Sequence, residues 1–387
     1  MPYAEEIKRI LVSDLLSDIA NPRDIQQCLE QQMKNWYPSR GNSKAALLLE
    51  QEKEFRWSRH LIFRIIDSHL PQAQQIMVKC LKLQDSLGRV QHEIRAAQDA
   101  QQLEFEALSL LYNRFGKSQV DGVTAVRPLT HFPDLNALAM EYLPGSHLRD
   151  LICHAARPLA RQGQVAVAVE AARKAGRLLR NIHRIKQGDY PRKEVFTMEY
   201  FTVRLQEILD ILLRQVSSKK TRNRLLCMLE NLHKMPPITY KDLAVSYLHG
   251  DIYPDNFILL PNGRVYTIDT TLHQTGLAEE DIAKFLIGVE TLKQHIVGGN
   301  ILIRPSFIHS FTQAFCNGYG SHGQYLSVML ILKLTALLHR WSELLSILQH
   351  KMTPAVTSAF QMFRVNPFML ARVDEIRRQL KGNLLPS

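Results

Sequence analysis

The chain has 387 residues, of which 45% are hydrophobic, so it is long enough for one large two-lobed domain or two ordinary ones. Its formal charge of +11 favours anionic partners such as nucleotides, phosphorylated glycans, nucleic acid or an acidic membrane surface. The first residues are acidic rather than basic and apolar, and the longest apolar stretch is interrupted by Lys333. A secretory signal and a transmembrane helix are therefore not expected.

The five cysteines are scattered without paired spacing, which fits neither a disulfide framework nor a zinc site. This pattern indicates a reducing compartment, and we expect a cytoplasmic protein. Two modest basic clusters, at 219–224 and around Arg377, are not interleaved with aromatic side chains that could stack on bases. We therefore expect solvated helix faces and no nucleic-acid partner. Peripheral contact with a membrane stays open, and the oligomeric state is not indicated.

The first part of the chain divides at about residue 53. Residues 1–52 are polar and predict a helical extension without recognisable chemistry. Beyond them, a small antiparallel sheet is predicted from strands at 61–66, 75–81, 122–128 and 137–142. One helix interrupts these strands, because Glu104, Leu108 and Leu111 recur at helical spacing.

The second part of the chain begins after a linker at Leu143-Pro144-Gly145, where proline and glycine mark a break. Most of it is predicted to be helical, with helices at 165–185, 200–215 and 221–233 and further helices up to the C-terminus. The sequence thus predicts an α+β protein with a sheet-containing lobe at 53–143 and a larger helical lobe at 144–387. A ligand would lie in the cleft between the lobes.

A predicted hairpin interrupts the helices of the larger lobe. The strand-like runs 257–260 and 264–268 flank Asn262-Gly263, and Asn-Gly is the strongest signal for a two-residue hairpin loop. The corresponding antiparallel register pairs 260 with 265 and places Asn256 opposite Asp269. Directly opposed residues have Cβ atoms roughly 5 Å apart.

The hairpin follows the segment His249-Gly250-Asp251-Ile252-Tyr253-Pro254-Asp255-Asn256. An amide oxygen of Asn256 and a carboxylate of Asp269 could together bind Mg²⁺, which prefers oxygen ligands. Asp251, on the loop before the hairpin, would then be free to accept the proton of a hydroxyl group. The combination predicts the catalytic segment of a kinase-type phosphotransferase.

Together with other landmarks in the same order, this segment resembles the aminoglycoside phosphotransferase and choline kinase group of small-molecule kinases. The resemblance covers roughly residues 54–345 and implies a protein-kinase-like fold. Val78-Lys79 is similar to the strand lysine that contacts the nucleotide phosphates in this family. Glu104 matches the helix glutamate that pairs with this lysine, with Glu106 as the alternative.

The run from Ala139 to Gly145 resembles the family's hinge segment. The resemblance implies that the carbonyl of Glu141 and the amide of Leu143 hold the adenine edge, and that Met140 lines the nucleotide pocket. These contacts use mainly the backbone, so the side chain of Glu141 need not contribute to nucleotide binding.

Three other residues resemble supporting positions of the family. His183 and His249 are expected to be structural, and Asp281 is expected to support the loops of the site. Two departures from the family pattern stand out: no glycine-rich loop occurs near Trp57 to His60, and Thr270-Thr271 follows Asp269 where an aromatic residue is usual. The G-x-G-x-x-G pattern at 318–323 follows a helical segment rather than a strand, so it predicts a helix-ending loop and not a dinucleotide site.

The function implied is transfer of the γ-phosphoryl group of ATP, or GTP, to a hydroxyl of a small molecule or glycan, with Mg²⁺. The basic C-terminal region argues against an aminoglycoside and favours a sugar, a phosphorylated glycan or a surface-polysaccharide precursor, so an anionic acceptor is considered. One alternative is a protein kinase, which the missing glycine-rich loop and the lack of a basic residue between Asp251 and Asn256 disfavour. The other is a non-catalytic nucleotide-binding scaffold, which the retained lysine, carboxylates and asparagine disfavour.

Overall fold

The computed structural model describes residues 21–36, 46–55, 58–66, 74–81, 94–116, 122–186, 188, 190–233, 239–270, 272, 274–320 and 326–384. The chain forms two compact units. The N-terminal unit consists of Met1–Val120, Thr124–Pro144 and Thr267–Thr271, and the C-terminal unit of Asp121–Val123, Gly145–Tyr266 and Leu272–Ser387. The break between Pro144 and Gly145 lies within the predicted linker, whereas the return of the chain at 267–271 was not expected.

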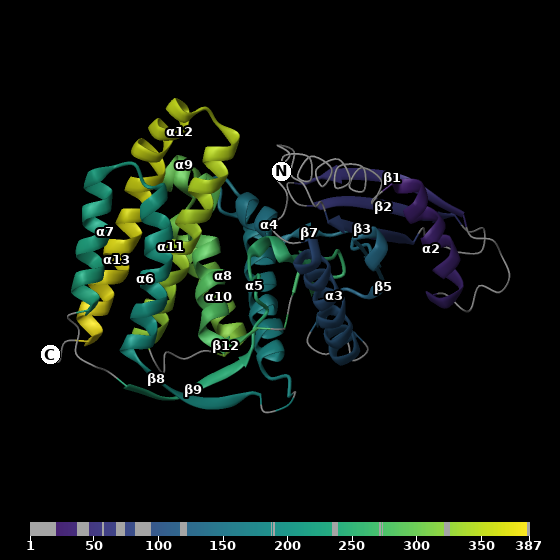
Figure 1. Cartoon of the computed structure of the whole chain (residues 1–387), viewed down its shortest axis with the longest axis horizontal. Helices are drawn as coiled ribbons and strands as arrows, with labels where there is room; N and C mark the ends of the chain where they lie inside the picture. Colours follow the sequence, from purple (N-terminus) through teal and green to yellow (C-terminus); the bar gives the residue numbers. More distant parts are fainter. Residues whose placement is uncertain are drawn as a thin grey trace, which may run out of the picture. The chain divides into compact units, whose positions relative to one another are not determined.

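The N-terminal unit contains a five-stranded sheet in the order β1-β2-β3-β6-β5 (Figure 1). Its strands are β1 (Ala46–Glu54), β2 (Ser58–Ile66), β3 (Gln75–Leu81), β5 (Pro128–Phe132) and β6 (Ala137–Glu141), and each neighbouring pair is antiparallel. The predicted strands at 61–66, 75–81 and 137–142 are thereby confirmed. The unit also contains helix α2 (Pro22–Trp36), helix α3 (Ile94–Leu111) and the π-helical turn η2 (Tyr112–Gly116), and β4 (Val123–Ala125) begins within the predicted strand at 122–128.

Helices α2 and α3 use opposite faces of this sheet. In β3, Ile76, Val78 and Cys80 are buried in one hydrophobic cluster together with Leu29 and three other residues of α2. Side chains alternate between the two faces of a strand, so Lys79 must point the other way. The α3 side chains Gln101 and Glu104 contact Lys79 on that second face. This alternation is what positions the lysine.

The predicted polar extension at 1–52 is wrong in its boundary, because β1 begins at Ala46 and residue 52 lies inside this strand. Glu50 and Glu52 gave β1 a polar appearance, but they form cross-strand ion pairs with Arg64 and Arg59. Helix α2 is helical as predicted. Its buried side chains, at the helical spacing of Ile25, Leu29, Met33 and Trp36, belong to the core of the unit rather than to an appendage.

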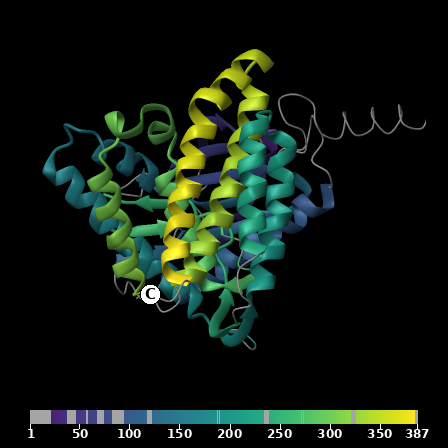
Figure 2. The same cartoon turned by 90° about the vertical axis from the view of Figure 1, so that its left-hand side faces the viewer.

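The C-terminal unit is mainly helical. Its helices are α4 (Leu148–Ala155), α5 (Gln162–His183), α6 (Met198–Gln215), α7 (Lys219–His233), α8 (Ala278–Glu290), α9 (Lys293–Leu302), α10 (Pro305–Tyr319), α11 (Leu326–Lys351), α12 (Pro354–Phe360) and α13 (Asn366–Leu384). A π-helical turn η6 (Gln361–Val365) joins α12 to α13. Helices α6, α7, α11 and α13 run side by side (Figures 1 and 2), with the fully buried Trp341 of α11 in their core. The helices predicted at 165–185, 200–215 and 221–233 are confirmed. No helix among the described residues has the length and apolarity needed to cross a membrane.

The C-terminal unit also contains strands that the sequence did not reveal. The strands β8 (Arg192–Thr197), β9 (Thr239–Tyr247) and β12 (Thr275–Leu277) form an antiparallel sheet in the order β12-β9-β8. Charged residues such as Lys241 and Asp242 obscure the alternation in β9, and Asp242 has a positive φ of 59° that breaks its regularity. Two further short strands, β7 (Ser146–His147) and β10 (Phe257–Leu259), pair near the predicted hairpin.

Helices α5 and α10 approach each other closely through glycine. A Cβ atom on Gly318 would lie 1.9 Å from the carbonyl oxygen of Arg173, and one on Gly176 would lie 2.1 Å from that of Phe315. Gly320 ends α10 in the left-handed conformation, with φ of 79°. The first two glycines of the 318–323 pattern therefore serve helix packing and helix termination, as the prediction of a helix-ending loop requires, and the remainder of the pattern lies outside the described residues.

Candidate active site

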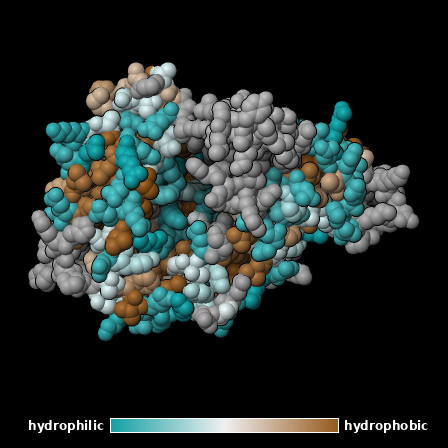
Figure 3. Space-filling model, viewed as in Figure 1, coloured by the Kyte–Doolittle hydropathy of each residue, from teal (hydrophilic) through white to brown (hydrophobic). Residues whose placement is uncertain are grey.

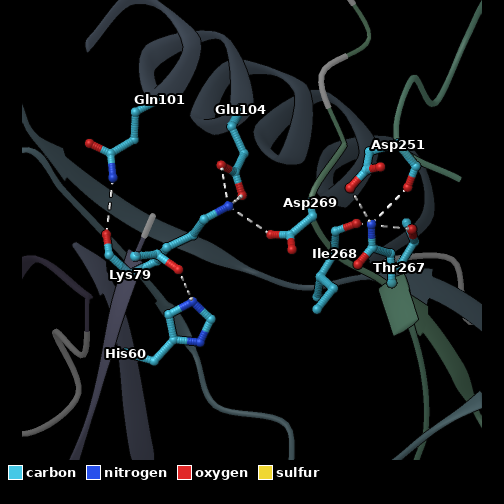
Figure 4. Close-up of polar contacts among 10 residues, drawn as sticks. His60, Lys79, Gln101, Glu104, Asp251, Thr267, Ile268 and Asp269 are labelled. Atoms are coloured by element: carbon cyan, nitrogen blue, oxygen red, sulfur yellow. Dashed lines mark hydrogen bonds and ion pairs between the residues drawn. The ribbon is translucent and has the colours of Figure 1, made fainter. Parts of the chain in front are cut away.

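Lys79 lies at the centre of a charge cluster in the N-terminal unit (Figure 4). Its Nζ donates hydrogen bonds to both carboxylate oxygens of Glu104, at 3.0 and 2.8 Å, and to Oδ1 of Asp269 at 2.9 Å. The predicted pairing of Lys79 with Glu104 is confirmed. The alternative, Glu106, is instead bonded to Gln102 on the outer side of α3.

One ammonium group thus serves two carboxylates. Burial lowers the pKa of Lys79, but the attraction of Asp269 and Glu104 outweighs burial and holds this pKa above its ordinary value. The pKa of Asp269 is held below its usual range, because the contacts with Lys79 overcome the effect of burial. Burial raises the pKa of Glu104 despite the opposing attraction of Lys79. Asp269 is therefore the carboxylate of this cluster that stays charged most readily.

Two features around the lysine were not expected from the sequence. Gln101, one helical turn before Glu104, donates from Nε2 to the backbone oxygen of Lys79 at 3.0 Å and is buried (Figure 4). Gln101 precedes Glu104 by three residues, and this spacing could have indicated that both side chains lie on the same face of the helix. Asp269 has a positive φ of 54°, a strained conformation that persists only where the surroundings fix it.

The hinge predicted from Ala139 to Gly145 begins in β6, the neighbour of β3. The buried Met140 pairs with Met77 across these strands, and Leu143 follows at the end of the unit. The amide of Glu141 donates to the carbonyl oxygen of Arg127 at 2.9 Å. Burial raises the pKa of the Glu141 side chain. The adenine contacts expected of Met140, Glu141 and Leu143 stay a prediction.

The hairpin after the catalytic segment exists, but its predicted loop is wrong. The amide of Gly263 donates to the carbonyl oxygen of Leu260, and the amide of Leu260 donates to that of Arg264, both at 2.9 Å. Leu260 therefore pairs with Arg264, and the loop has three residues. Gly263, with φ of 78°, takes the left-handed position that such a loop requires. The register argument that set Asn256 opposite Asp269 fails by one residue, because proline before Asn-Gly changes the turn.

The segment before the hairpin connects the two polar residues predicted there. Nδ2 of Asn256 donates to the backbone oxygen of Asp251 at 2.7 Å and to its carboxylate Oδ2 at 2.8 Å. Asn256 is buried, whereas Asp251 is exposed. The amide nitrogen of Asn256 thus orients the carboxylate of Asp251, and its carbonyl oxygen is the atom suited to bind a cation.

The backbone of this segment is held from α8 and α5. Oδ2 of Asp281 accepts the amide hydrogen of His249 at 2.6 Å and lies 3.0 Å from Nε2 of His183. The opposite ring nitrogen of His183 lies 2.9 Å from the hydroxyl of Tyr319. Burial raises the pKa of Asp281, but the hydrogen bond from His183 outweighs it and keeps the pKa below its usual value. The expected supporting roles of His183 and Asp281 match these contacts, whereas the role expected of the His249 side chain stays a prediction.

A pocket of about 210 Å³ in the C-terminal unit adjoins the same segment. Its charged lining residues are Arg204, Glu280 and Lys284, and its other lining residues include Phe201, Tyr253 and His339. Arg204 and Glu280 form a two-pronged ion pair, with nitrogen-to-oxygen distances of 2.6 and 2.9 Å. Lys284 donates instead to the backbone oxygen of Gly250 at 3.2 Å, directly before Asp251. This pocket was not predicted, because its residues come from four separate segments of the chain.

Comparison with solved structures shows fold similarity at low sequence identity. A choline kinase from Cryptosporidium parvum Iowa II has a TM-score of 0.53 at 11% identity, covering 95% of this chain and 98% of that one. The choline kinase LicA from Streptococcus pneumoniae has a TM-score of 0.46 at 13% identity, covering 89% and 99%. An ethanolamine kinase from Plasmodium vivax has a TM-score of 0.47 at 12% identity, covering 86% and 83%. The first of these supports the predicted α+β, protein-kinase-like fold.

Comparison of the sequence with family models gives a match of residues 57–325 to the phosphotransferase enzyme family. A comparison with curated proteins gives no match. The matched range contains Lys79, Glu104, Asp251, Asn256 and Asp269, and it covers more than half of the chain. The chain therefore belongs to the phosphotransferase enzyme family.

Proposed function

We propose that the protein transfers the γ-phosphoryl group of ATP to a hydroxyl group of a small, anionic acceptor. The observation that carries this proposal is the sharing of Lys79 Nζ between the carboxylates of Glu104 and Asp269. A lysine fixed in this way offers a rigid positive charge to phosphate oxygens, and phosphoryl transfer depends mainly on positioning and charge neutralisation.

Nucleotide binding is assigned to the N-terminal unit. Lys79, oriented by Glu104, would contact the α- and β-phosphates. The adenine edge would meet the backbone of Glu141 and Leu143, with the buried Met140 beneath it. Backbone recognition of this kind leaves the Glu141 side chain without a direct role.

Asn256 and Asp269 are the residues proposed to hold Mg²⁺. They offer an amide oxygen and a carboxylate, the oxygen ligands that this hard cation prefers, and Mg²⁺ usually takes one or two such ligands together with substrate phosphates. The low pKa of Asp269 keeps its carboxylate charged, and its side chain is 31% exposed. A bound divalent cation would neutralise charge on the transferring phosphate.

Asp251 is the proposed general base. Its Oδ2 is held by the amide of Asn256, so the carboxylate has a fixed orientation. In the transfer, the acceptor hydroxyl loses its proton to Asp251 while its oxygen bonds to the γ-phosphorus. The bond between this phosphorus and the bridging oxygen breaks, and ADP leaves.

The pocket beside Gly250 is the proposed acceptor site. Two cationic residues and one anionic residue line it, and the anionic residue, Glu280, is already paired with Arg204. Lys284 is thus the charge that an acceptor would meet, and a phosphate or carboxylate group on the acceptor would complement it. We further propose a cytoplasmic location, because the five cysteines are free, as a reducing compartment would keep them.

A mass-spectrometric screen tests the proposed function. The protein is incubated with ATP and Mg²⁺ and with hydroxyl compounds in matched pairs, such as sugars and sugar phosphates, together with choline and ethanolamine. We expect products one phosphoryl group heavier from the anionic members, and none with the Asp251→Asn variant. Products from the cationic amino alcohols alone would contradict the acceptor class, and no product with any hydroxyl compound would contradict phosphotransfer to an alcohol.

A further inference from the structure

The helical segment from Pro354 to Pro367 presents apolar side chains to solvent. Val356 is 53% exposed, Met362 55% and Phe363 70%. They lie on one side of the continuous helical segment α12–η6–α13. Together with exposed neighbours one, three or four residues apart, they define the α12 apolar face, which consists of Ala355, Val356, Ala359, Met362, Phe363 and Pro367. Apolar atoms lie at the end of the C-terminal unit where α12 is labelled (Figures 1 and 3).

The opposite side of this segment already anchors it to the unit. Thr357, Gln361, Val365 and Met369 recur every four residues and are buried. Thr357 donates to the backbone of α11, at 3.2 Å from the oxygen of Leu348, and Val365 and Met369 belong to the main hydrophobic cluster. Packing against the unit therefore explains the buried side of this segment but not its exposed apolar side chains. Large apolar side chains gathered on the exposed side of a helical segment are typical of an interaction surface.

The sequence around the α12 apolar face is poor in acidic residues. Between Thr291 and Val373 the only acidic residue is Glu343, and it is already paired with Arg340 and His339. The same stretch contains seven basic residues. Lys333, Arg340 and Arg372 pair with Glu290, Glu343 and Glu375, and the others are Lys293, Arg304, Lys351 and Arg364. Arg364 is exposed and directly follows Phe363. An apolar face with an exposed arginine directly beside Phe363 complements an anionic, apolar partner.

We propose that the α12 apolar face is a docking site for an anionic lipid surface. Val356, Met362 and Phe363 would enter the boundary between head groups and acyl chains, with the helical segment lying along the surface. Arg364 would contact the lipid phosphates. Apolar burial and attraction to anionic lipids together determine the strength of such peripheral binding.

A second copy of the chain fits this face less well. In a symmetric dimer the same patch meets itself, so Arg364 of one copy would approach Arg364 of the other. With Glu343 already paired, the stretch from 291 to 373 has no other acid to compensate them. The charge pattern therefore favours the lipid surface.

Sedimentation with vesicles tests the proposal on the full chain. Vesicles of phosphatidylcholine alone are compared with vesicles that contain phosphatidylglycerol as well. We expect the wild type to bind the mixed vesicles and not the neutral ones. The double variant with Met362→Ser and Phe363→Ser should bind at least tenfold more weakly, because both apolar side chains lose their burial in the lipid.

Matched controls distinguish binding through this face from nonspecific hydrophobic binding. Leu159→Ser removes an apolar side chain that is 96% exposed elsewhere on the unit, and it should leave binding unchanged. Arg364→Gln should weaken binding roughly fivefold, the effect of one basic residue near an anionic surface. Arg157→Gln changes an exposed arginine outside the α12–η6–α13 segment and should have a smaller effect.

Three outcomes would overturn the proposal. The first is equal binding of the wild type to neutral and mixed vesicles, or to neither. The second is a loss with Leu159→Ser as large as with the double variant. The third is a dimer in light scattering that the double variant converts to a monomer, since this would assign the face to a second copy. Phosphotransfer to a water-soluble acceptor should be the same in all variants, so docking and catalysis are tested independently.

Discussion

Asp251 and Asp255 lie in the same short segment, but their surroundings differ. Asp251 is oriented by the amide of Asn256, whereas Asp255 pairs with Arg149 at 2.7 Å and is 45% exposed. If Asp251 is the general base, Asp251→Asn should lower kcat by roughly 10²- to 10⁴-fold, because proton acceptance is lost. The melting temperature should change little, since Asp251 is exposed.

Asp255→Asn is the matched control for this prediction. It removes a carboxylate from the same segment, and we expect nearly wild-type turnover in a steady-state assay of ADP release. Equal losses in the two variants would indicate that the segment tolerates no change of charge, and would remove the reason to assign the base to Asp251.

Lys284 should determine the affinity for the acceptor rather than the rate of transfer. Its only hydrogen bond among the described residues goes to the backbone oxygen of Gly250, so its charge is available to a bound anion. Lys284→Met should raise KM for an anionic acceptor by roughly tenfold, as loss of a charged hydrogen bond implies, and leave KM for ATP unchanged. Lys193→Met removes an exposed lysine from β8 and serves as the control. A change in kcat with no change in KM would contradict this role.

For individual residues, the sequence predicted which side chains belong to the site better than it predicted how they contact one another. The pairing of Lys79 with Glu104 could be predicted because both residues occur in a recognisable order. The contact of Lys79 with Asp269 could not, since they lie 190 residues apart and no local rule relates them. The hairpin register was missed because the Asn-Gly signal predicts a two-residue loop, while Pro261 and a left-handed Gly263 produce three.

The close contact of α5 and α10 makes a prediction for these elements. Gly318→Ala would place a methyl group 1.9 Å from the backbone oxygen of Arg173, so the helices must separate. We expect a loss of about 1 to 3 kcal/mol in the free energy of unfolding, the usual cost of overpacking. Gly163→Ala at the start of α5 meets no atom within 4 Å and should be neutral or slightly stabilising. Urea denaturation of the two variants checks both expectations.

The contact of α8 with the catalytic segment makes stability depend on pH. In the folded chain the pKa of Asp281 is below its ordinary value, so the unfolded chain takes up the proton first as the pH falls. The stabilisation is complete above an unfolded pKa of roughly 4 and is lost as the pH falls through the folded value. Asp281→Asn should lower stability by roughly 2 kcal/mol at neutral pH and flatten the acid part of the curve.

Urea denaturation between neutral and acid pH measures this effect. Asp210→Asn, which changes an exposed carboxylate of α6, is the control and should keep the wild-type profile. If the free energy of unfolding of Asp281→Asn fell with acid pH as steeply as that of the wild type, other carboxylates would be responsible for the loss of stability in acid.

Elements with strong periodicity were predicted correctly, and those with mixed patterns were not. Helix α5 and strand β3 show clear periods, and both were found. The strands β1 and β9 carry charged side chains that break the alternation, and only their cross-strand partners reveal them. Helix α2 was recognised as a helix, but its packing on the sheet depends on tertiary contacts that its polar composition conceals.

For the whole molecule, the assignment of the nucleotide to the N-terminal unit predicts where ATP acts. Mg-ATP at a hundred times its Kd should stabilise the protein by about 2.7 kcal/mol. Hydrogen exchange should slow in β3 and β6, which contain Lys79 and Met140, and stay unchanged in α7 and α13. Lys79→Met should abolish both effects. Protection confined to the helices of the C-terminal unit would refute the assignment.

The two-unit organisation was predictable from the sequence, because the predicted strands and helices segregate along the chain and Pro144 marks the break. The exception is the return of Thr267–Thr271 to the N-terminal unit. This return has a consequence for how the protein can be inherited or engineered. A gene fragment that ends at Pro144 encodes Lys79 and Glu104 but not Asp269, so the nucleotide-binding half cannot be exchanged between relatives as a contiguous cassette. Recombination at the linker would combine the N-terminal unit with the segment 267–271 of another protein. Only crossovers that keep 267–271 with residues up to 144 preserve the native charge cluster.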